Sequence, residues 1–178
     1  TALSRLLADP RVAYVEEDGV ATINPTLSGP TWGIDRVDQR NLPLSGTYTY
    51  DTTATGVHAY IVDTGVLTGH TEFTGRMGNG FRAIADDGLG TSDCNGHGTH
   101  VAGTVGGTTY GVAKLVTLVP VRVLDCSGAG PLEAVVAGID WVAADHLAGQ
   151  PAVANLSLGL EMQPGTDAVD AAVEGLIA

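Results

Sequence analysis

Apolar runs of strand length alternate with helical patterns along most of this 178-residue chain. The β-rich runs cover residues 57–62, 116–124 and 152–158. The helical patterns cover residues 97–105, 131–148 and 166–178. The second helical pattern has a continuous apolar stripe, with Pro131 expected at its first position and Gly149 expected at its C-terminal cap. This alternation predicts an α/β fold, in which a parallel sheet carries helices on both faces.

Two polar residues stand where such a fold places functional groups, at the carboxyl ends of strands and the starts of helices. Asp63 follows the run 57–62, and His97 opens the helical pattern 97–105 between two glycines. Each residue alone is weak evidence, because Asp-Thr-Gly is a common turn and a histidine between glycines is often a loop residue. Together they provide a base with a near-neutral pKa and a carboxylate that can hold its tautomer, as hydrolysis by a serine nucleophile requires.

The segments around these residues, Ile61-Val-Asp-Thr-Gly-Val66 and Asn95-Gly-His-Gly-Thr-His-Val-Ala-Gly-Thr104, resemble the Asp and His boxes of the subtilisin-like serine proteases, the subtilases. Further segments resemble the proteinase K and aqualysin-like branch of that family: residues 32–39, 93–97, 110–114, 121–126 and 152–159. The resemblance implies a subtilisin-like fold and a serine endopeptidase that uses an Asp-His-Ser triad and an acyl-enzyme. Asp63 and His97 would be its catalytic acid and base.

The family's third box, a Gly-Thr-Ser-Met-Ala-type segment that carries the nucleophile, does not occur in these 178 residues. We therefore expect an N-terminal part of a subtilase, truncated before the C-terminal half and inactive by itself. Residues 1–24, a helix followed by a strand, resemble the end of the family's inhibitory propeptide. Residues 25–30 form a turn-rich linker, and residues 31–178 begin the catalytic domain. The resemblance implies a secreted, extracellular zymogen that is inhibited by its own propeptide and is a monomer when full length.

Substrate binding is expected in two short segments. In the family an extended peptide pairs as a strand with two stretches of enzyme backbone. The resemblance implies that substrate contacts come from Leu124, Ser127, Gly128, Ala129, Gly130, Ser157, Leu158 and Gly159. Without the family, two ordinary loop turns would be the simpler interpretation. Leu160 stands where this branch more often has a small residue, which bears on the shape of the specificity pocket.

A calcium site is a second expectation. Asp35, Asp38 and Gln39 form an oxygen-rich i, i+3, i+4 cluster, and calcium prefers hard oxygen ligands. A solvated turn or helix start is the alternative, and the resemblance favours calcium because relatives bind it near this segment. Asp86, Asp87 and Asp93 are a weaker second candidate.

Composition excludes several other classes of function. The net charge is −12 with eight Lys and Arg residues, so no basic patch for nucleic acid can form. No apolar run reaches the length of a membrane span. Cys94 and Cys126 are too few for a structural zinc site, and by composition alone they are free thiols or one disulfide. The aqualysin-like resemblance and an extracellular setting imply the disulfide.

Two competing functions remain. One is a metallohydrolase that uses Asp63, His97 and His100, but the i, i+3 spacing of the histidines differs from the i, i+4 pair of His-Glu-x-x-His helices. The other is a truncated or degenerate subtilase that only binds peptides. Structural or solvated roles are expected for the other histidines, His58, His70, His100 and His146.

Overall fold

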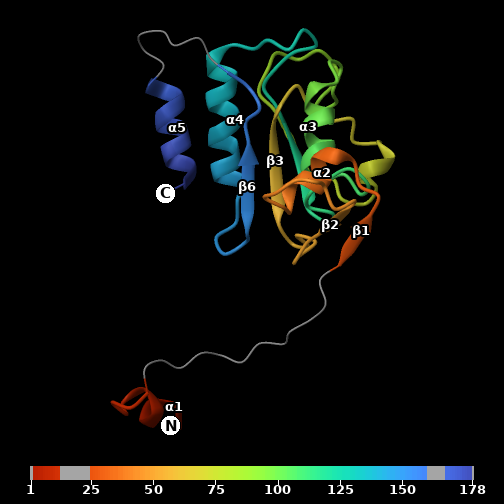
Figure 1. The fold of residues 1–178 in the computed structure, drawn as a ribbon. Helices are drawn as coiled ribbons and strands as arrows, with labels where there is room; N and C mark the ends of the chain where they lie inside the picture. Colours follow the sequence, from red (N-terminus) through yellow and green to blue (C-terminus); the bar gives the residue numbers. More distant parts are fainter. Residues whose placement is uncertain (1, 13–24, 160–166, 178) are drawn as a thin grey trace.

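The computed structural model describes residues 2–12, 25–159 and 167–177, and a four-stranded parallel sheet lies at its centre (Figure 1). The strand order is β4-β5-β3-β6. These strands are β3 (His58–Asp63), β4 (Phe81–Arg82), β5 (Thr117–Arg122) and β6 (Ala152–Asn155). Asp63 pairs in register with Arg122, so β3 and β5 end at the same edge of the sheet.

Helices cover both faces of this sheet, as the alternation predicts, and each face has its own apolar core. Helix α3 (His97–Gly106) packs on one face, where Ala59 and Ile61 of β3 are fully buried. Helices α4 (Leu132–Asp145) and α5 (Asp167–Ile177) pack on the other face, against Tyr60 and Val62. Successive residues of β3 therefore alternate between the two cores, which is the two-residue period of a strand.

The elements are shorter than expected at several ends. The predicted strand 152–158 stops at Asn155, and the predicted helix 131–148 covers only Leu132–Asp145. Pro131 is the N-cap rather than the first helical residue, because its ψ of 150° is extended. His146 is the C-cap in place of Gly149, whose φ of +85° instead serves the turn that leads to β6.

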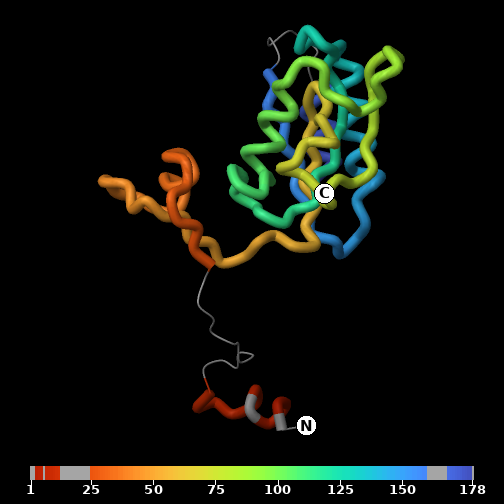
Figure 2. The backbone as a smooth tube through the Cα atoms, turned by 90° about the vertical axis from the view of Figure 1, so that its right-hand side faces the viewer, coloured from red at the N-terminus to blue at the C-terminus, as the bar shows by residue number. Residues whose placement is uncertain are grey.

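A smaller N-terminal unit precedes the sheet. It contains β1 (Thr26–Ser28), α2 (Trp32–Val37) and β2 (Thr47–Thr49), and β1 pairs antiparallel with β2. Figure 2 shows this unit to one side of the main body, joined to it by the chain that leads into β3. The buried Tyr48 connects the two, because its hydroxyl donates to the Val112 carbonyl at 3.1 Å.

Residues 25–30, which the sequence predicts as a turn-rich linker, include the paired strand β1. Helix α1 (Ala2–Leu7) agrees with the helix expected near the start of the chain. The strand expected after it falls mostly in residues 13–24, outside the described residues. A short 3-10 helix, η1 (Thr71–Phe73), lies between β3 and β4. None of the helices in the described segments has the length and apolar character needed to cross a bilayer.

Candidate active site

Asp63 and His97 meet at the carboxyl edge of the sheet. Asp63 is the last residue of β3 and its side chain is fully buried, whereas His97 is the first residue of α3 and its side chain is 48% exposed. Asp63 Oδ1 and His97 Nδ1 are 2.7 Å apart. The hydrogen bond expected between them is therefore present, and the outer edge of the imidazole stays accessible. This is the arrangement in which a carboxylate fixes a histidine as a base.

Helix α3 lies close enough to β3 to make this contact because Gly98 has no side chain. A Cβ on Gly98 would stand 2.1 Å from the Gly65 carbonyl oxygen and 3.1 Å from Asp63 Cβ. The fully buried Ala102 continues the close packing one turn later. Gly103, in the same helix, instead faces open space.

A cleft of about 530 Å³ opens beside His97. It is lined by all eight residues expected to bind substrate: Leu124, Ser127, Gly128, Ala129, Gly130, Ser157, Leu158 and Gly159. The structure thus brings the two predicted segments together around the imidazole. Thr64, Asn95 and Val135 also line the cleft, and sequence reasoning missed all three. Thr64 and Asn95 lie within the two motifs, whereas Val135 lies in the helical pattern 131–148.

The side chain of Asp125 accepts several hydrogen bonds from the loop 127–130. One oxygen of this carboxylate accepts hydrogen bonds from the Ser127 hydroxyl at 2.6 Å, the Ser127 amide at 2.8 Å and the Ala129 amide at 3.2 Å. These bonds, the Ser127 hydroxyl first, hold the pKa of Asp125 below its ordinary value. Asp125 therefore links two residues of the loop that forms one wall of the cleft.

A disulfide joins the histidine segment to the same wall. Cys94 and Cys126 are bonded, with their Cα atoms 5.0 Å apart, so the pairing implied by the resemblance is present. The neighbouring Asn95 side chain donates to the Cys126 carbonyl at 3.1 Å. The bridge therefore links the residues just before His97 to those just before the loop 127–130.

The weaker cation candidate does not assemble. Asp87 forms a two-point ion pair with the buried Arg122, at 2.6 and 3.0 Å, and this pair lowers the pKa of Asp87. Asp86 pairs with Arg82 at 3.2 Å, and Asp93 is surrounded by hydrogen-bond donors. Within the described ranges these three carboxylates form no common cluster. Each of the three carboxylates therefore has its own partners: an arginine for Asp86 and for Asp87, and hydrogen-bond donors for Asp93.

The first candidate, Asp35, Asp38 and Gln39, is more compact. The Asp35 carboxylate is buried and accepts from the Ser45 amide and hydroxyl, both at 3.1 Å, and from the Gly46 amide at 2.8 Å. The Gln39 side-chain oxygen accepts from the same Ser45 amide at 3.0 Å. Asp38 instead accepts from the Thr49 amide at 2.6 Å. Asp35 and Gln39 thus accept from the same Ser45 amide, whereas Asp38 accepts from the adjoining strand β2.

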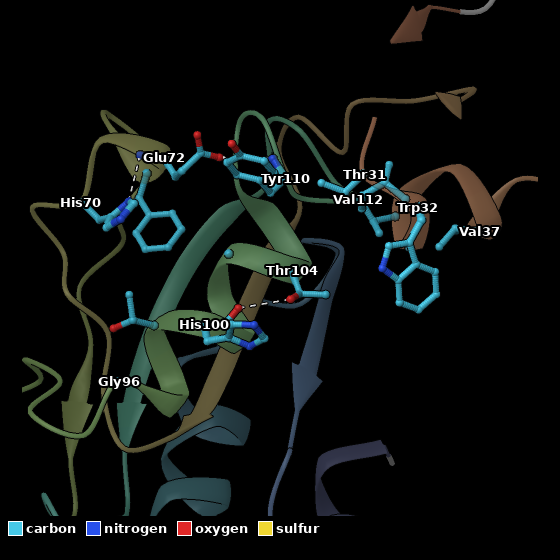
Figure 3. A pocket seen from close by; sticks show the side chains of 15 residues that line it. Thr31, Trp32, Val37, His70, Glu72, Gly96, His100, Thr104, Tyr110 and Val112 are labelled. Carbon is cyan, nitrogen blue, oxygen red and sulfur yellow. Dashed lines mark hydrogen bonds between the residues drawn. The ribbon is translucent and has the colours of Figure 1, made fainter. Parts of the chain in front are cut away.

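A second cleft, of about 740 Å³, lies between α2 and α3 (Figure 3). His100 lines it together with Trp32, Thr104 and Tyr110, and neither Asp63 nor His97 does. His100 thus belongs to a different surface of α3 from His97, so the two imidazoles do not share one site. This placement contradicts a metallohydrolase built on Asp63, His97 and His100.

A buried carboxylate, an accessible imidazole bonded to it and an adjoining cleft lie together at the carboxyl edge of the sheet, and serine hydrolases arrange their acid and base in this way. The sequence profile of the subtilase family, Peptidase S8, matches residues 54–177. The chain belongs to the subtilase family.

Individual relatives agree with this assignment. The chain is 61% identical over 157 residues to an extracellular serine proteinase of Thermus sp. (strain Rt41A), covering 88% of this chain and 38% of that protein. It is 51% identical over 179 residues to alkaline serine exoprotease A of Vibrio alginolyticus, covering 97% and 33%. The crystal structure of a cold-adapted subtilisin-like serine proteinase superposes with a TM-score of 0.75 at 51% identity, covering 83% of this chain and 54% of that one. The chain thus spans about a third to a half of the relatives it matches.

Proposed function

We propose that the protein containing this chain is a secreted serine endopeptidase in which Asp63 and His97 are the acid and base of the catalytic triad. The observation that carries this proposal is the 2.7 Å contact between Asp63 Oδ1 and His97 Nδ1 at the rim of the 530 Å³ cleft. The names of the relatives, an extracellular serine proteinase and an exoprotease, support both the chemistry and the location.

In this reaction His97 Nε2 takes the proton of a serine hydroxyl as the serine oxygen bonds to the substrate carbonyl carbon. The proton then passes to the departing amine, and water releases the acyl group by the same route in reverse. Asp63 holds Nδ1 as the protonated nitrogen and stabilises the imidazolium. The serine and the oxyanion donors come from residues outside the 178 of this chain, consistent with its coverage of the relatives.

Peptide or protein substrates bind in extended form between the two cleft walls, residues 127–130 and 157–159. Both walls adjoin the imidazole, so a peptide backbone lying between them presents its carbonyl groups to His97. Pairing of a strand with exposed backbone supplies affinity that does not depend on side-chain identity, and this favours broad specificity.

Residues 1–24 act as the end of an inhibitory propeptide, and cleavage precedes the mature segment. This cleavage falls in the interval between Asn24 and Thr31. The pairing of Thr26–Ser28 with β2 favours its N-terminal edge, next to Pro25, since a later cut would remove a paired strand. N-terminal sequencing of the active protein tests this boundary, and a start after Ser28 would contradict it.

Calcium binds at Asp35, Asp38 and Gln39. The donor set is all oxygen and includes a buried carboxylate, which fits a hard cation. The ion would supply structural stability by joining α2 to the start of β2, and it takes no part in the chemistry.

The activity is tested with the intact protein and a chromogenic peptide. We expect hydrolysis that a serine-directed covalent inhibitor abolishes and that His97→Ala removes. Peptide binding without hydrolysis in the wild-type protein would instead identify a peptide-binding pseudoenzyme.

A further inference from the structure

Asp93 has the most densely bonded carboxylate near the candidate active site. Its Oδ1 accepts from the Thr64 hydroxyl and from the amides of Asn95 and Gly96, each at 2.9 Å. Its Oδ2 accepts from the Thr99 amide at 2.9 Å and the Thr99 hydroxyl at 2.5 Å. Five donors from four residues therefore converge on the Asp93 side chain. None of these five hydrogen bonds involves Asp63 or His97.

These bonds complete the amino end of α3, where His97 is the first residue. The amides of a first helical turn have no partners within the helix. Its N-cap, Gly96, has no side chain that could serve them. The amide of His97 donates to the Asn95 side chain at 3.2 Å, that of Gly98 to the Thr64 hydroxyl at 2.9 Å, and that of Thr99 to Asp93.

The same network joins α3 to the end of β3. Thr64 follows Asp63 directly, is fully buried, and donates its amide to Asp63 Oδ1 at 2.7 Å. Its hydroxyl donates to Asp93 while accepting from the Gly98 amide. Asp93 is thus bonded at one end to the residue after Asp63 and at the other to the helical turn that begins with His97.

We propose that Asp93 is a positioning residue that sets the distance and angle between Asp63 and His97. This inference rests on the proposed function, because it concerns the same acid–base pair. A negative charge at a helix amino end is also favourable to the helix dipole, so the carboxylate suits this place in its ionised form.

The titration of Asp93 agrees with an ionised role. Burial by itself would raise the pKa of this carboxyl, but the hydrogen bonds from Gly96, Thr99 and Asn95 outweigh burial and lower the pKa. Both side-chain oxygens of Asp93 must act as acceptors to bind the five donors, and only the ionised carboxylate provides two such oxygens. An amide in its place would turn one acceptor into a donor that faces Thr99 or Thr64.

The test compares Asp93→Asn with Asp86→Asn in the intact protein. Asp86 is a matched control, because its carboxylate also accepts from the amide two residues on, at 3.0 Å to Gly88, but bonds to neither Thr64 nor α3. We expect Asp93→Asn to lower kcat by about 10- to 100-fold with KM little changed, as misplacement of a catalytic group does. Asp86→Asn should keep both constants.

A spectroscopic measurement separates positioning from general stability. The proton on His97 Nδ1, bonded to Asp63, should give a downfield NMR resonance in the folded protein. Asp93→Asn should shift or broaden that resonance at temperatures where circular dichroism shows the variant to be folded. An unchanged resonance together with unchanged kcat would overturn the proposal.

A second pair of variants covers the case in which Asp93→Asn does not fold. Thr64→Val removes the hydroxyl that bonds to Asp93 and Gly98, whereas Thr64→Ser keeps it. We expect Thr64→Val to lower kcat and move the His97 resonance, and Thr64→Ser to restore both. Equal behaviour of the two variants would count against the network. If the wild-type protein shows no peptidase activity, the proposed function fails, and the resonance still decides whether Asp93 positions His97.

Discussion

Asp63 and His97 are 34 residues apart in the sequence, yet Oδ1 of one lies 2.7 Å from Nδ1 of the other. The carboxylate is fully buried and the imidazole is about half exposed. Because the acid is shielded from water and the base is not, the pair can hold a proton on Nδ1 and exchange one at Nε2. Each of the following predictions tests the pair or the structure that supports it.

Replacing Asp63 with Asn should lower kcat by about 10⁴-fold, because the amide favours the wrong tautomer of His97 while keeping the shape of the site. Steady-state kinetics of the intact protein provide the measurement. His100→Ala is the control: His100 lines the cleft between α2 and α3, so this variant should retain activity. A large loss in His100→Ala with little loss in Asp63→Asn would reject the assignment of the acid.

Replacing Gly98 with Ala should both destabilise the protein and reduce activity. The new Cβ would lie 2.1 Å from the Gly65 carbonyl, so α3 must move away from β3. Overpacking of this kind costs about 1–3 kcal/mol. Displacement of His97 by about 1 Å costs about 100-fold in rate. Urea unfolding and peptide hydrolysis measure the two effects.

Gly103→Ala is the matched control for that variant. It makes the same change in the same helix, at a position where the new Cβ would meet no atom within 4 Å apart from its chain neighbours and the backbone of its own helix. It should raise stability by about 0.5–1 kcal/mol, since alanine loses less backbone entropy than glycine in a helix. Destabilisation by Gly103→Ala comparable to that of Gly98→Ala would show that the close approach of α3 is not the cause.

Removing the disulfide by the double replacement Cys94→Ser and Cys126→Ser should lower the free energy of unfolding by about 3–4 kcal/mol. This value follows from the chain entropy of a closed loop whose ends are 32 residues apart. Urea unfolding of the wild-type protein with and without a reductant should reproduce the loss, and the double variant should be insensitive to the reductant. Loss well under 1 kcal/mol would indicate that the Asn95 and Arg122 contacts hold the loops without the bridge.

Calcium removal should lower the melting temperature of the intact protein. A ligand present at 100 times its Kd stabilises the folded state by about 2.7 kcal/mol, and a chelator removes that contribution. Asp35→Asn should reduce the sensitivity to chelator, because Asp35 is the buried carboxylate of the proposed site. A chelator effect of the same size in wild type and variant would place the responsible ion elsewhere.

Stability should fall steeply below about pH 4. The pKa of Asp93 is lower in the folded protein than in the unfolded chain, where it is about 3.9. The contribution of Asp93 is therefore complete above the unfolded value and is lost as pH falls through the folded value. Asp87 and Asp125 have the same sign of shift. Urea unfolding from pH 6 to 2.5 should show a shallower decline for Asp93→Asn, and parallel curves would contradict this role.

Local patterns were enough to predict the parallel sheet and its two layers of helices. The residues of β3 are apolar on both sides because both of its faces are buried, and α4 has an apolar stripe of helical period. The ends were predicted less well. Nothing in the chain marks Asn155 as the last residue of β6, and β4 is too short to have a pattern of its own.

The sequence by itself determined the candidate acid and base, because each lies in a short motif whose residue types carry its chemistry. The two cleft segments and the pairing of the two cysteines followed from the resemblance of the sequence to the subtilase family. Tertiary structure decided which donors surround Asp93, which glycine of α3 must remain small, and which histidine faces the cleft. All three features depend on the packing of α3 against β3, two elements that are separated by more than thirty residues in the sequence. Hydrogen bonds and close contacts between distant segments leave no local periodicity. The sequence therefore indicates only a possible cation ligand at Asp93, whereas the structure surrounds this carboxylate with five donors.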